Sequence, residues 1–153
     1  MTALYHHTMS MERTWKASLD RVWAAWTDPE LKLQWFRGPE GQWEPLRTSI
    51  DFRVGGTEIH EGRFVESGMV SLYTSRVHLI EAPSRLVYAY DMHLNGEHHS
   101  VSLATVELEA RGGATTLRYH EQIVFVDGED SIENRREGTE GLLDRIGALI
   151  LAE

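Results

Sequence analysis

The sequence predicts an α+β domain in which one antiparallel sheet packs against a long C-terminal helix. Strand-length segments rich in Val, Ile, Thr and aromatic residues run from Trp43 to Phe125 and are separated by turn signals. Their short links imply antiparallel pairing, because parallel neighbours need long crossover connections. After Asp127-Gly128 the apolar spacing becomes helical, and this last helix is the only element large enough to cover one face of the sheet.

One strand and two short helices are expected before these segments. The strand covers about residues 7–16 and carries on one face Met9, Met11, Arg13 and Trp15. Ser18 offers an N-cap for the first helix, whose apolar stripe contains Leu19, Val22, Trp23 and Trp26. Asp28 caps the second helix, Pro29 suits its first position, and Gly38-Pro39 stops it.

Five turn signals divide the central region into six strands. They are Gly55-Gly56, Ser67-Gly68, Ala82-Pro83-Ser84, Asn95-Gly96 and Gly112-Gly113. The last helix has an apolar arc made of Ile132, Thr139, Leu142, Leu143, Ile146, Leu149 and Ile150. No linker, repeat or low-complexity stretch interrupts the chain, so residues 1–153 are expected to form a single domain.

The Gly112-Gly113 hairpin predicts which side chains point inward. A two-residue turn pairs Arg111 with Ala114, and one face of the two strands then carries Ser102, Ala104, Val106, Leu108, Leu117, Tyr119, Glu121 and Ile123. Glu121 is the one acid on this face. A buried carboxylate needs a partner or it takes up a proton, so Glu121 is either a structural acid paired with an Arg or Tyr, or a residue that faces a ligand.

The Asn95-Gly96 hairpin allows two registers. A tight two-residue turn would place Tyr88 and Tyr90 on the outer face. A three-residue loop, with Gly96 as the left-handed bulge residue, would pair Tyr88 with Ser102 and place both tyrosines inside. We prefer the loop, because it sets large aromatic rings opposite small residues, an arrangement that can enclose a cavity.

Composition excludes several classes of function. Lys plus Arg number 15 and Asp plus Glu number 24, and the resulting net charge of −9 argues against nucleic acid or an anionic membrane surface as the main partner. The absence of Cys excludes a disulfide framework, a thiolate zinc site, an iron–sulfur cluster and a cysteine nucleophile. No apolar run approaches about 18 residues, so no membrane span is expected. The start of the chain lacks signal-peptide features, and a cytoplasmic location is expected.

No pattern indicates a cofactor or a metal. The chain has no Ser-His-Asp arrangement, nucleophile elbow, phosphate-binding glycine loop or dinucleotide fingerprint. Its eight His residues do not follow a metal-ligand spacing. We therefore expect neither a cofactor nor a metal ion.

Several motifs resemble one superfamily. Residues 18–31 (SLDRVWAAWTDPEL), followed by Trp35-Phe36, resemble the opening of the START-like (SRPBCC) superfamily, in the branch named after the activator of the heat-shock-protein-90 ATPase. Further similar motifs are 51–56 (DFRVGG), 82–88 (APSRLVY), 100–106 (SVSLATV), 120–122 (HEQ) and 138–144 (GTEGLLD). The resemblance covers about residues 15–152 in the family's order. It implies the helix-grip (START/Bet v-like) fold, a curved antiparallel sheet around a long C-terminal helix, with a cavity between them.

The resemblance does not imply one function, since relatives bind lipids, hormones or polyketides and some are cyclases or hydrolases. The leading hypothesis is a binding protein for a small apolar or aromatic molecule. The residues expected to contact it are Trp35, Phe36, Tyr73, Tyr88, Tyr90, Met92, Tyr119, Glu121, Leu142, Ile146 and Leu149. The alternative for the same residues is an ordinary packed core.

Two other functions are kept open. One is a cyclase- or hydrolase-type enzyme that uses Glu121 as general acid or base. The other is an interaction role, either a stress-related or co-chaperone-like module or a homodimer formed through an outer apolar patch of Val87, Val101, Leu103 and Val124. The last helix contains Gly138, Gly141 and Gly147. These glycines serve close helix–sheet packing, or Gly138 and Gly141 make space beside the cavity or form a bend at its mouth.

Overall fold

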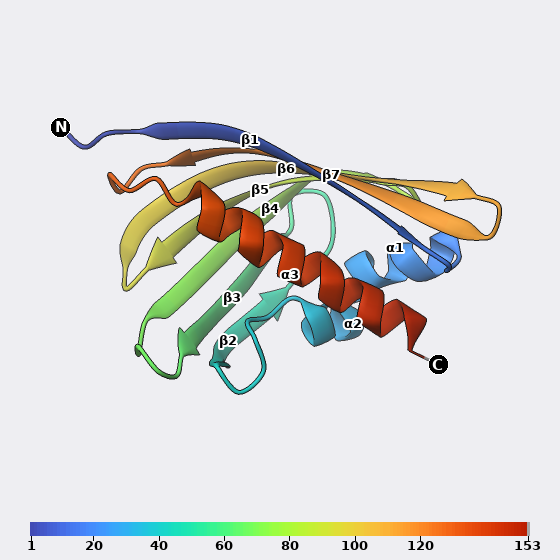
Figure 1. Ribbon diagram of the computed structural model, residues 1–153, viewed down its shortest axis with the longest axis horizontal. Helices are drawn as coiled ribbons and strands as arrows, with labels where there is room; N and C mark the ends of the chain where they lie inside the picture. The colour runs from blue at the N-terminus through green and yellow to red at the C-terminus, as the bar shows by residue number, and fades with distance from the viewer. Residues whose placement is uncertain (153) are drawn as a thin grey trace.

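Seven antiparallel strands form one sheet in the order β1-β7-β6-β5-β4-β3-β2, and a long helix crosses one of its faces (Figure 1). The computed structural model describes residues 1–152. The strands are β1 (Tyr5–Trp15), β2 (Trp43–Ile50), β3 (Thr57–Phe64), β4 (Val70–Glu81), β5 (Arg85–Leu94), β6 (Glu97–Arg111) and β7 (Ala114–Phe125). The helices are α1 (Leu19–Thr27), α2 (Pro29–Trp35) and α3 (Ile132–Leu151).

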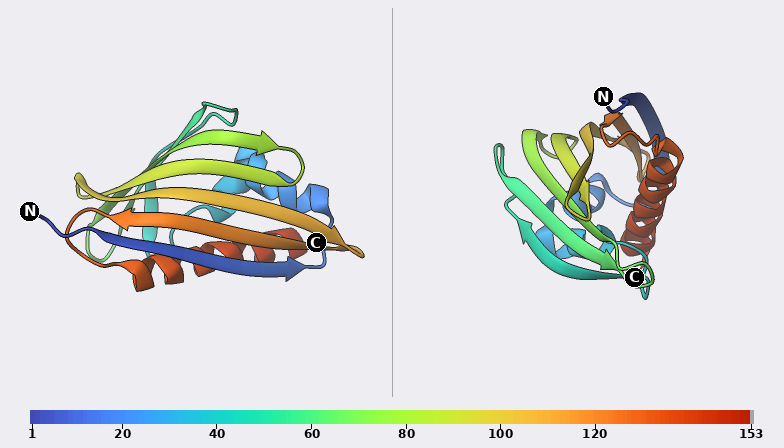
Figure 2. Two further views of the ribbon diagram at one scale, coloured as in Figure 1. Left: turned by 90° about the horizontal axis from the view of Figure 1, so that it is seen from above. Right: turned by 90° about the vertical axis from the view of Figure 1, so that its left-hand side faces the viewer.

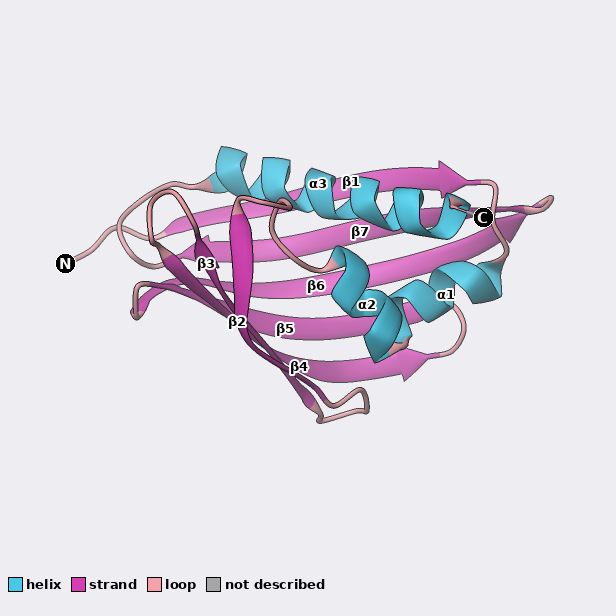
Figure 3. Cartoon of the chain, turned by 90° about the horizontal axis from the view of Figure 1, so that it is seen from below, coloured by secondary structure: helices cyan, strands magenta, loops and turns pink. Residues whose placement is uncertain are grey.

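The sheet is curved, and α3 lies along its concave side (Figure 2). Helices α1 and α2 cover one end of the same face (Figure 3). This is the predicted α+β helix-grip arrangement, and the predicted order of one strand, two helices, six strands and one long helix is confirmed. Within residues 1–152, none of the three helices combines the length and hydropathy that crossing a bilayer requires.

The caps of the short helices are those that the sequence predicts. The Ser18 side chain accepts a hydrogen bond from the backbone N–H of Arg21 at the start of α1. Asp28 ends α1 and caps α2 by accepting from the N–H of Glu30. The indole N–H of Trp35 donates to the carbonyl of Ala25 at 2.7 Å, so α2 is fixed against α1 by a buried hydrogen bond.

The register of the β6–β7 hairpin is confirmed, since Arg111 pairs with Ala114 and Ala104 pairs with Glu121. The three-residue loop preferred for the β5–β6 hairpin is wrong. Asn95 (φ 50°) and Gly96 (φ 79°) form a tight two-residue turn, because left-handed residues at both central positions match the twist of a hairpin.

The tyrosines of β5 nevertheless face inward. The register shifts next to the turn, where His99 on β6 is an extra residue in the ladder. A bulge of this kind reverses the alternation of facing. Tyr88 therefore pairs with Ala104 and Tyr90 with Ser102, so the large rings do lie on the concave face opposite small residues.

Two glycines of α3 have different roles. A Cβ at Gly147 would lie 2.6 Å from the indole nitrogen of Trp15, so this glycine allows α3 to approach β1 closely. At Gly138 a Cβ would meet no atom within 4 Å. The two explanations considered for helix glycines therefore apply to different positions: close packing at Gly147 and open space at Gly138.

Candidate functional site

A cavity of about 640 Å³ lies between the concave face of the sheet and α3. Its walls come from α1, from the end of α2 and the segment after it, from residues of β2 to β7, and from α3 between Asn134 and Arg145. Most of the lining area belongs to large apolar and aromatic side chains. The aromatic members are Trp26, Trp35, Phe36, Trp43, Phe64, Tyr73, Tyr88, Tyr90 and Tyr119.

The rings on the wall contact one another. The Phe36 and Tyr73 centroids are 4.7 Å apart in an edge-to-face arrangement, and those of Tyr73 and Tyr90 are 4.8 Å apart. Trp43 packs directly over Gly62, where a Cβ would lie 1.9 Å from the indole. Such ring contacts hold the aromatic wall in one arrangement, because edge-to-face geometry is favoured for neighbouring rings.

A charged cluster lies beneath this wall. Lys32 Nζ is 2.9 Å from Glu58 Oε2 and 3.0 Å from Oε1, and both side chains are buried. His60 Nε2 lies 3.1 Å from Glu58 Oε2, where an imidazole N–H donates to the carboxylate. The Lys32 ammonium is also 5.1 Å from the centroid of the Phe36 ring, within cation–π range. His60 brings the cluster to the cavity, because its ring is part of the wall.

The environment of Glu58 favours its ionised form. Burial raises the pKa of this carboxyl, but the hydrogen bond from His60 and the charge of Lys32 outweigh burial and leave the pKa below its ordinary value of 4.5. Lys32 comes from α2, whereas Glu58 and His60 come from β3. The cluster therefore joins α2 to the sheet through a buried ion pair.

Glu121 is the centre of a second buried cluster. Its carboxylate accepts hydrogen bonds from Tyr90 Oη at 2.6 Å, Ser102 Oγ at 2.7 Å and Tyr119 Oη at 2.5 Å. Arg135 Nη1 lies 3.5 Å away and completes an ion pair. No part of Glu121 is exposed, and it does not line the cavity. Its oxygens are therefore occupied by the protein itself.

Arg135 connects this cluster to α3. Nη1 donates to Tyr90 Oη at 3.0 Å and Nη2 donates to Ser100 Oγ at 2.8 Å. Burial lowers the pKa of Arg135, but Tyr90 and Glu121 outweigh burial and raise it above its ordinary value. Burial is also the main reason that the pKa of Tyr90 is raised. The hydroxyl of Tyr90 thus stays a neutral donor to Glu121 over the whole working pH range.

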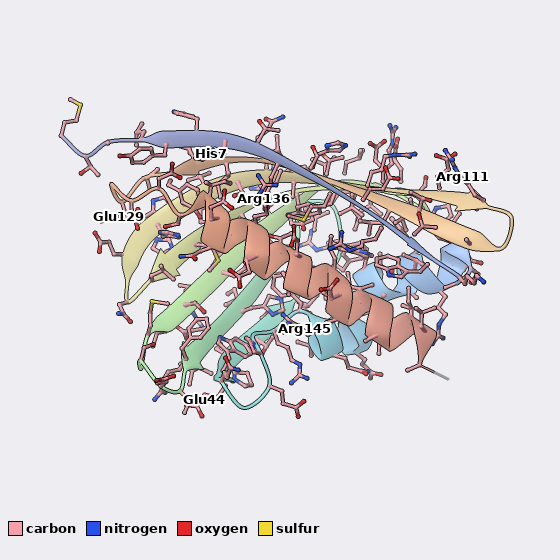
Figure 4. The ribbon with its side chains drawn as sticks, in the orientation of Figure 1. His7, Glu44, Arg111, Glu129, Arg136 and Arg145 are labelled. Carbon is pink, nitrogen blue, oxygen red and sulfur yellow. The ribbon has the colours of Figure 1, made fainter. Side chains whose placement is uncertain are left out.

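A second arginine of α3 contacts the end of α2. Arg145 Nε donates to the carbonyl of Trp35 at 3.1 Å, and Nη2 donates to the carbonyl of Arg37. Figure 4 shows Arg145 on the side of α3 that faces α2. Burial and the neighbouring charge of Arg37 hold the pKa of Arg145 below its ordinary value. Both arginines belong to the cavity wall.

One protein-family model matches most of this chain. The model described as Activator of Hsp90 ATPase homolog 1-like protein matches residues 16–150. The chain belongs to this family. The predicted START-like resemblance is therefore confirmed, and a search of the curated proteins gives no match.

Solved structures show how far this AHSA1-like chain resembles others. An uncharacterized protein from Rhizobium leguminosarum is 38% identical over 99% of this chain and 98% of its own, with a TM-score of 0.92. Mll3558 from Rhizobium loti is 36% identical over 96% and 99% of the two chains, with a TM-score of 0.87. The AHSA1-like protein from Aeromonas hydrophila, at 19% identity over 94% and 92% and a TM-score of 0.65, shows the shared fold alone.

Some of the side chains that the sequence predicts as ligand contacts line the cavity, and others do not. Eight of them lie together on the cavity wall of this AHSA1-like chain: Trp35, Phe36, Tyr73, Tyr88, Tyr90, Met92, Tyr119 and Leu142. Three do not line it. Glu121 lies behind the hydroxyls of two wall tyrosines, Ile146 is fully buried in the core, and Leu149 lines a smaller pocket beside α1.

Several polar residues of this region are not predicted by the sequence: Lys32 and Glu58 beneath the wall with His60 at its edge, and Arg37, Arg135 and Arg145 on the wall. A signal existed for the first three. Lys32 precedes Trp35 by three positions and so shares its helix face. Glu58 and His60 alternate along a strand and so share one face of the sheet. Arg37 and Arg145 have no such signal, since their proximity depends on how α3 crosses α2.

Among residues 1–152, no group of three or more His, Asp or Glu side chains is arranged to hold a metal ion.

The outer apolar patch that the sequence predicts is partly exposed. Val101 and Leu103 are exposed on the convex face, at 36% and 42%. The homodimer expected from this patch stays a prediction.

Proposed function

We propose that this AHSA1-like protein binds a small, largely apolar or aromatic molecule in the cavity between the sheet and α3. The observation that carries the proposal is the composition of the wall, where aromatic rings in mutual contact surround about 640 Å³ of space and a few polar groups are interspersed. Ligand sites of proteins have this combination, in which apolar area supplies affinity and a few polar groups fix orientation.

The clusters around the cavity support binding better than catalysis by Glu121. A general base must reach a proton of the substrate. Glu121 is fully buried, accepts three hydroxyl hydrogen bonds and pairs with Arg135. It acts as a positioning residue, because it accepts hydrogen bonds from the hydroxyls of Tyr90 and Tyr119, two residues that line the cavity.

Native mass spectrometry of freshly purified protein, followed by a thermal-shift screen of a metabolite library, tests the proposal. We expect either a co-purified small molecule or at least one compound that raises Tm. If neither method detects any bound molecule, the proposal is wrong.

A variant that fills part of the cavity tests whether the ligand binds there. Gly138→Leu adds a side chain to the wall at a position with no atom within 4 Å, so it should reduce ligand binding while the protein stays folded. Glu140→Leu adds the same side chain to α3 at an exposed position that does not line the cavity, and it should bind as the wild type does. Equal loss in both variants would locate the ligand elsewhere.

A further inference from the structure

Two arginines lie near each other on the cavity wall. Arg37 follows α2 and Arg145 lies on α3, and both line the cavity. Two nitrogens of Arg145 donate to backbone carbonyls of Trp35 and Arg37, which fixes the group in place. Its third nitrogen, Nη1, makes no hydrogen bond to the described residues. Gly141 lies beside this nitrogen, and a Cβ there would be in van der Waals contact with Nη1 at 3.7 Å.

The protein neutralises the positive charge of these two arginines only weakly. Within residues 1–152, Arg145 has no carboxylate partner within 4.0 Å. Arg37 has one, Glu40, at 3.6 Å, but that side chain is 86% exposed and such pairs are weak. Arg37 Nε is moreover buried and has no hydrogen-bond partner among the described residues. A buried donor without an acceptor is costly unless a ligand supplies one.

The other charges of the wall do not compete for an anion at these two arginines. Arg135 is already paired with Glu121. Glu137 is the one carboxylate on the wall, and it precedes Arg145 by eight helix positions, about 12 Å along the axis at 1.5 Å per residue. A chain of net charge −9 thus presents, beside an aromatic cavity, two guanidinium groups of which one has only an exposed carboxylate partner and the other has none within 4.0 Å among the described residues.

We infer that the cavity takes an amphipathic anion, whose carboxylate or phosphate head binds Arg37 and Arg145 and whose apolar body lies against Phe36, Tyr73 and Tyr88. Guanidinium groups present a planar fork of donors that matches both head groups. This inference rests on the proposed function and adds the chemical class of the ligand.

The test compares probes that share an apolar body and differ in the head. Dodecanoate, dodecyl phosphate and dodecanol form an aliphatic series, and 2-naphthylacetate and 2-(2-naphthyl)ethanol form an aromatic pair. Isothermal titration at concentrations below micelle formation gives each Kd. We expect at least one anion to bind roughly tenfold or more tightly than its alcohol, the range expected for a charge-assisted hydrogen bond. Preference between dodecanoate and dodecyl phosphate then assigns the head group.

Variants locate the head group. Arg37→Gln should abolish most of the anion preference, because it removes one guanidinium and leaves in place the Arg37 carbonyl that Arg145 contacts. Arg111→Gln is the matched control, since Arg111 is 62% exposed at the tip of the distant β6–β7 hairpin and its loss changes the net charge equally (Figure 4). Arg145→Lys, which keeps a charge but not the fork, should reduce the preference as well.

The outcomes separate the two proposals. An anion preference lost in Arg37→Gln and kept in Arg111→Gln supports the inference. Equal affinity for acids and alcohols, or an equal loss in both variants, overturns it and leaves the proposed binding function intact. If only neutral library compounds bind, the inference is likewise overturned. If nothing binds from either the probe series or the library, the proposed function and the inference both fail.

Discussion

Lys32 Nζ and Glu58 Oε2 are 2.9 Å apart, and only 7% and 2% of the two side chains are exposed. Taking two charges out of water is unfavourable, and the attraction between them offsets this cost only when the geometry is good and the remaining polar atoms are bonded. Here His60 supplies the additional hydrogen bond. The pair joins α2 to β3 directly beneath the aromatic wall, so its loss should affect both the stability and the shape of the site.

Breaking the pair from one side should be strongly destabilising. We expect Lys32→Met to lower the free energy of unfolding by about 3–5 kcal/mol, because it leaves Glu58 charged and buried without its main partner. The double variant Lys32→Met/Glu58→Gln should lose less than Lys32→Met alone, since neither charge remains. Urea unfolding measures all three proteins. The exposed pair of Asp51 and Arg53 serves as control, and Asp51→Asn should cost at most about 1 kcal/mol.

The ion pair of Lys32 and Glu58 should also make the free energy of unfolding depend on pH. The pKa of Glu58 is below 4.5 in the folded state, so this carboxylate binds fewer protons there than in the unfolded chain. Its contribution to stability is present above the unfolded pKa and is lost as the pH falls through the lower folded value. The unfolding free energy of the wild type should therefore fall more steeply between about pH 5 and pH 3 than that of Lys32→Met/Glu58→Gln. Parallel curves would contradict the role given to Glu58.

Local signals in the sequence predict the helices and strands of this protein, but they do not predict every strand register. Turn residues, caps and the spacing of apolar positions are local signals, and they predicted every helix and strand and the β6–β7 register. The β5–β6 turn was predicted wrongly because the bulge at His99 is not a local property of the turn. The inward facing of Tyr88 and Tyr90 was still correct, since burial of apolar area fixes which face a strand presents.

The polar part of the site was less predictable. Glu121 stands out in sequence as an acid among apolar neighbours, but its partners Ser102, Tyr90 and Arg135 come from three other elements. Those contacts occupy the oxygens of its carboxylate, whereas the sequence alone leaves open whether Glu121 faces a ligand. The proximity of Arg37 and Arg145 likewise depends on tertiary packing, which residue spacing does not encode.

Two tyrosines on the wall provide a matched test of hydrogen bonding. Tyr119 Oη donates to Glu121 at 2.5 Å, so Tyr119→Phe should lower the free energy of unfolding by about 1–3 kcal/mol by leaving one carboxylate oxygen without a donor. The Tyr73 hydroxyl is buried and approaches Ser75 without a hydrogen bond of normal geometry. Tyr73→Phe removes a polar atom that has no proper partner, and it should leave stability unchanged or raise it slightly. Urea unfolding of both variants checks the difference, and equal losses would contradict the assignment of Tyr119 to Glu121.

Gly138 and Gly147 of α3 give the last prediction. Alanine is favoured over glycine within a helix by about 1 kcal/mol, so a substitution that meets no obstacle should stabilise the protein. Gly138→Ala meets no atom within 4 Å and should raise the free energy of unfolding by up to about that amount. Gly147→Ala would place its Cβ 2.6 Å from Trp15 Nε1, and the forced separation of α3 from β1 should cost about 1–3 kcal/mol in spite of the better helix former. Opposite signs in urea unfolding are expected. If Gly147→Ala also stabilised the protein, the close approach of α3 to Trp15 would not be the reason for glycine at this position.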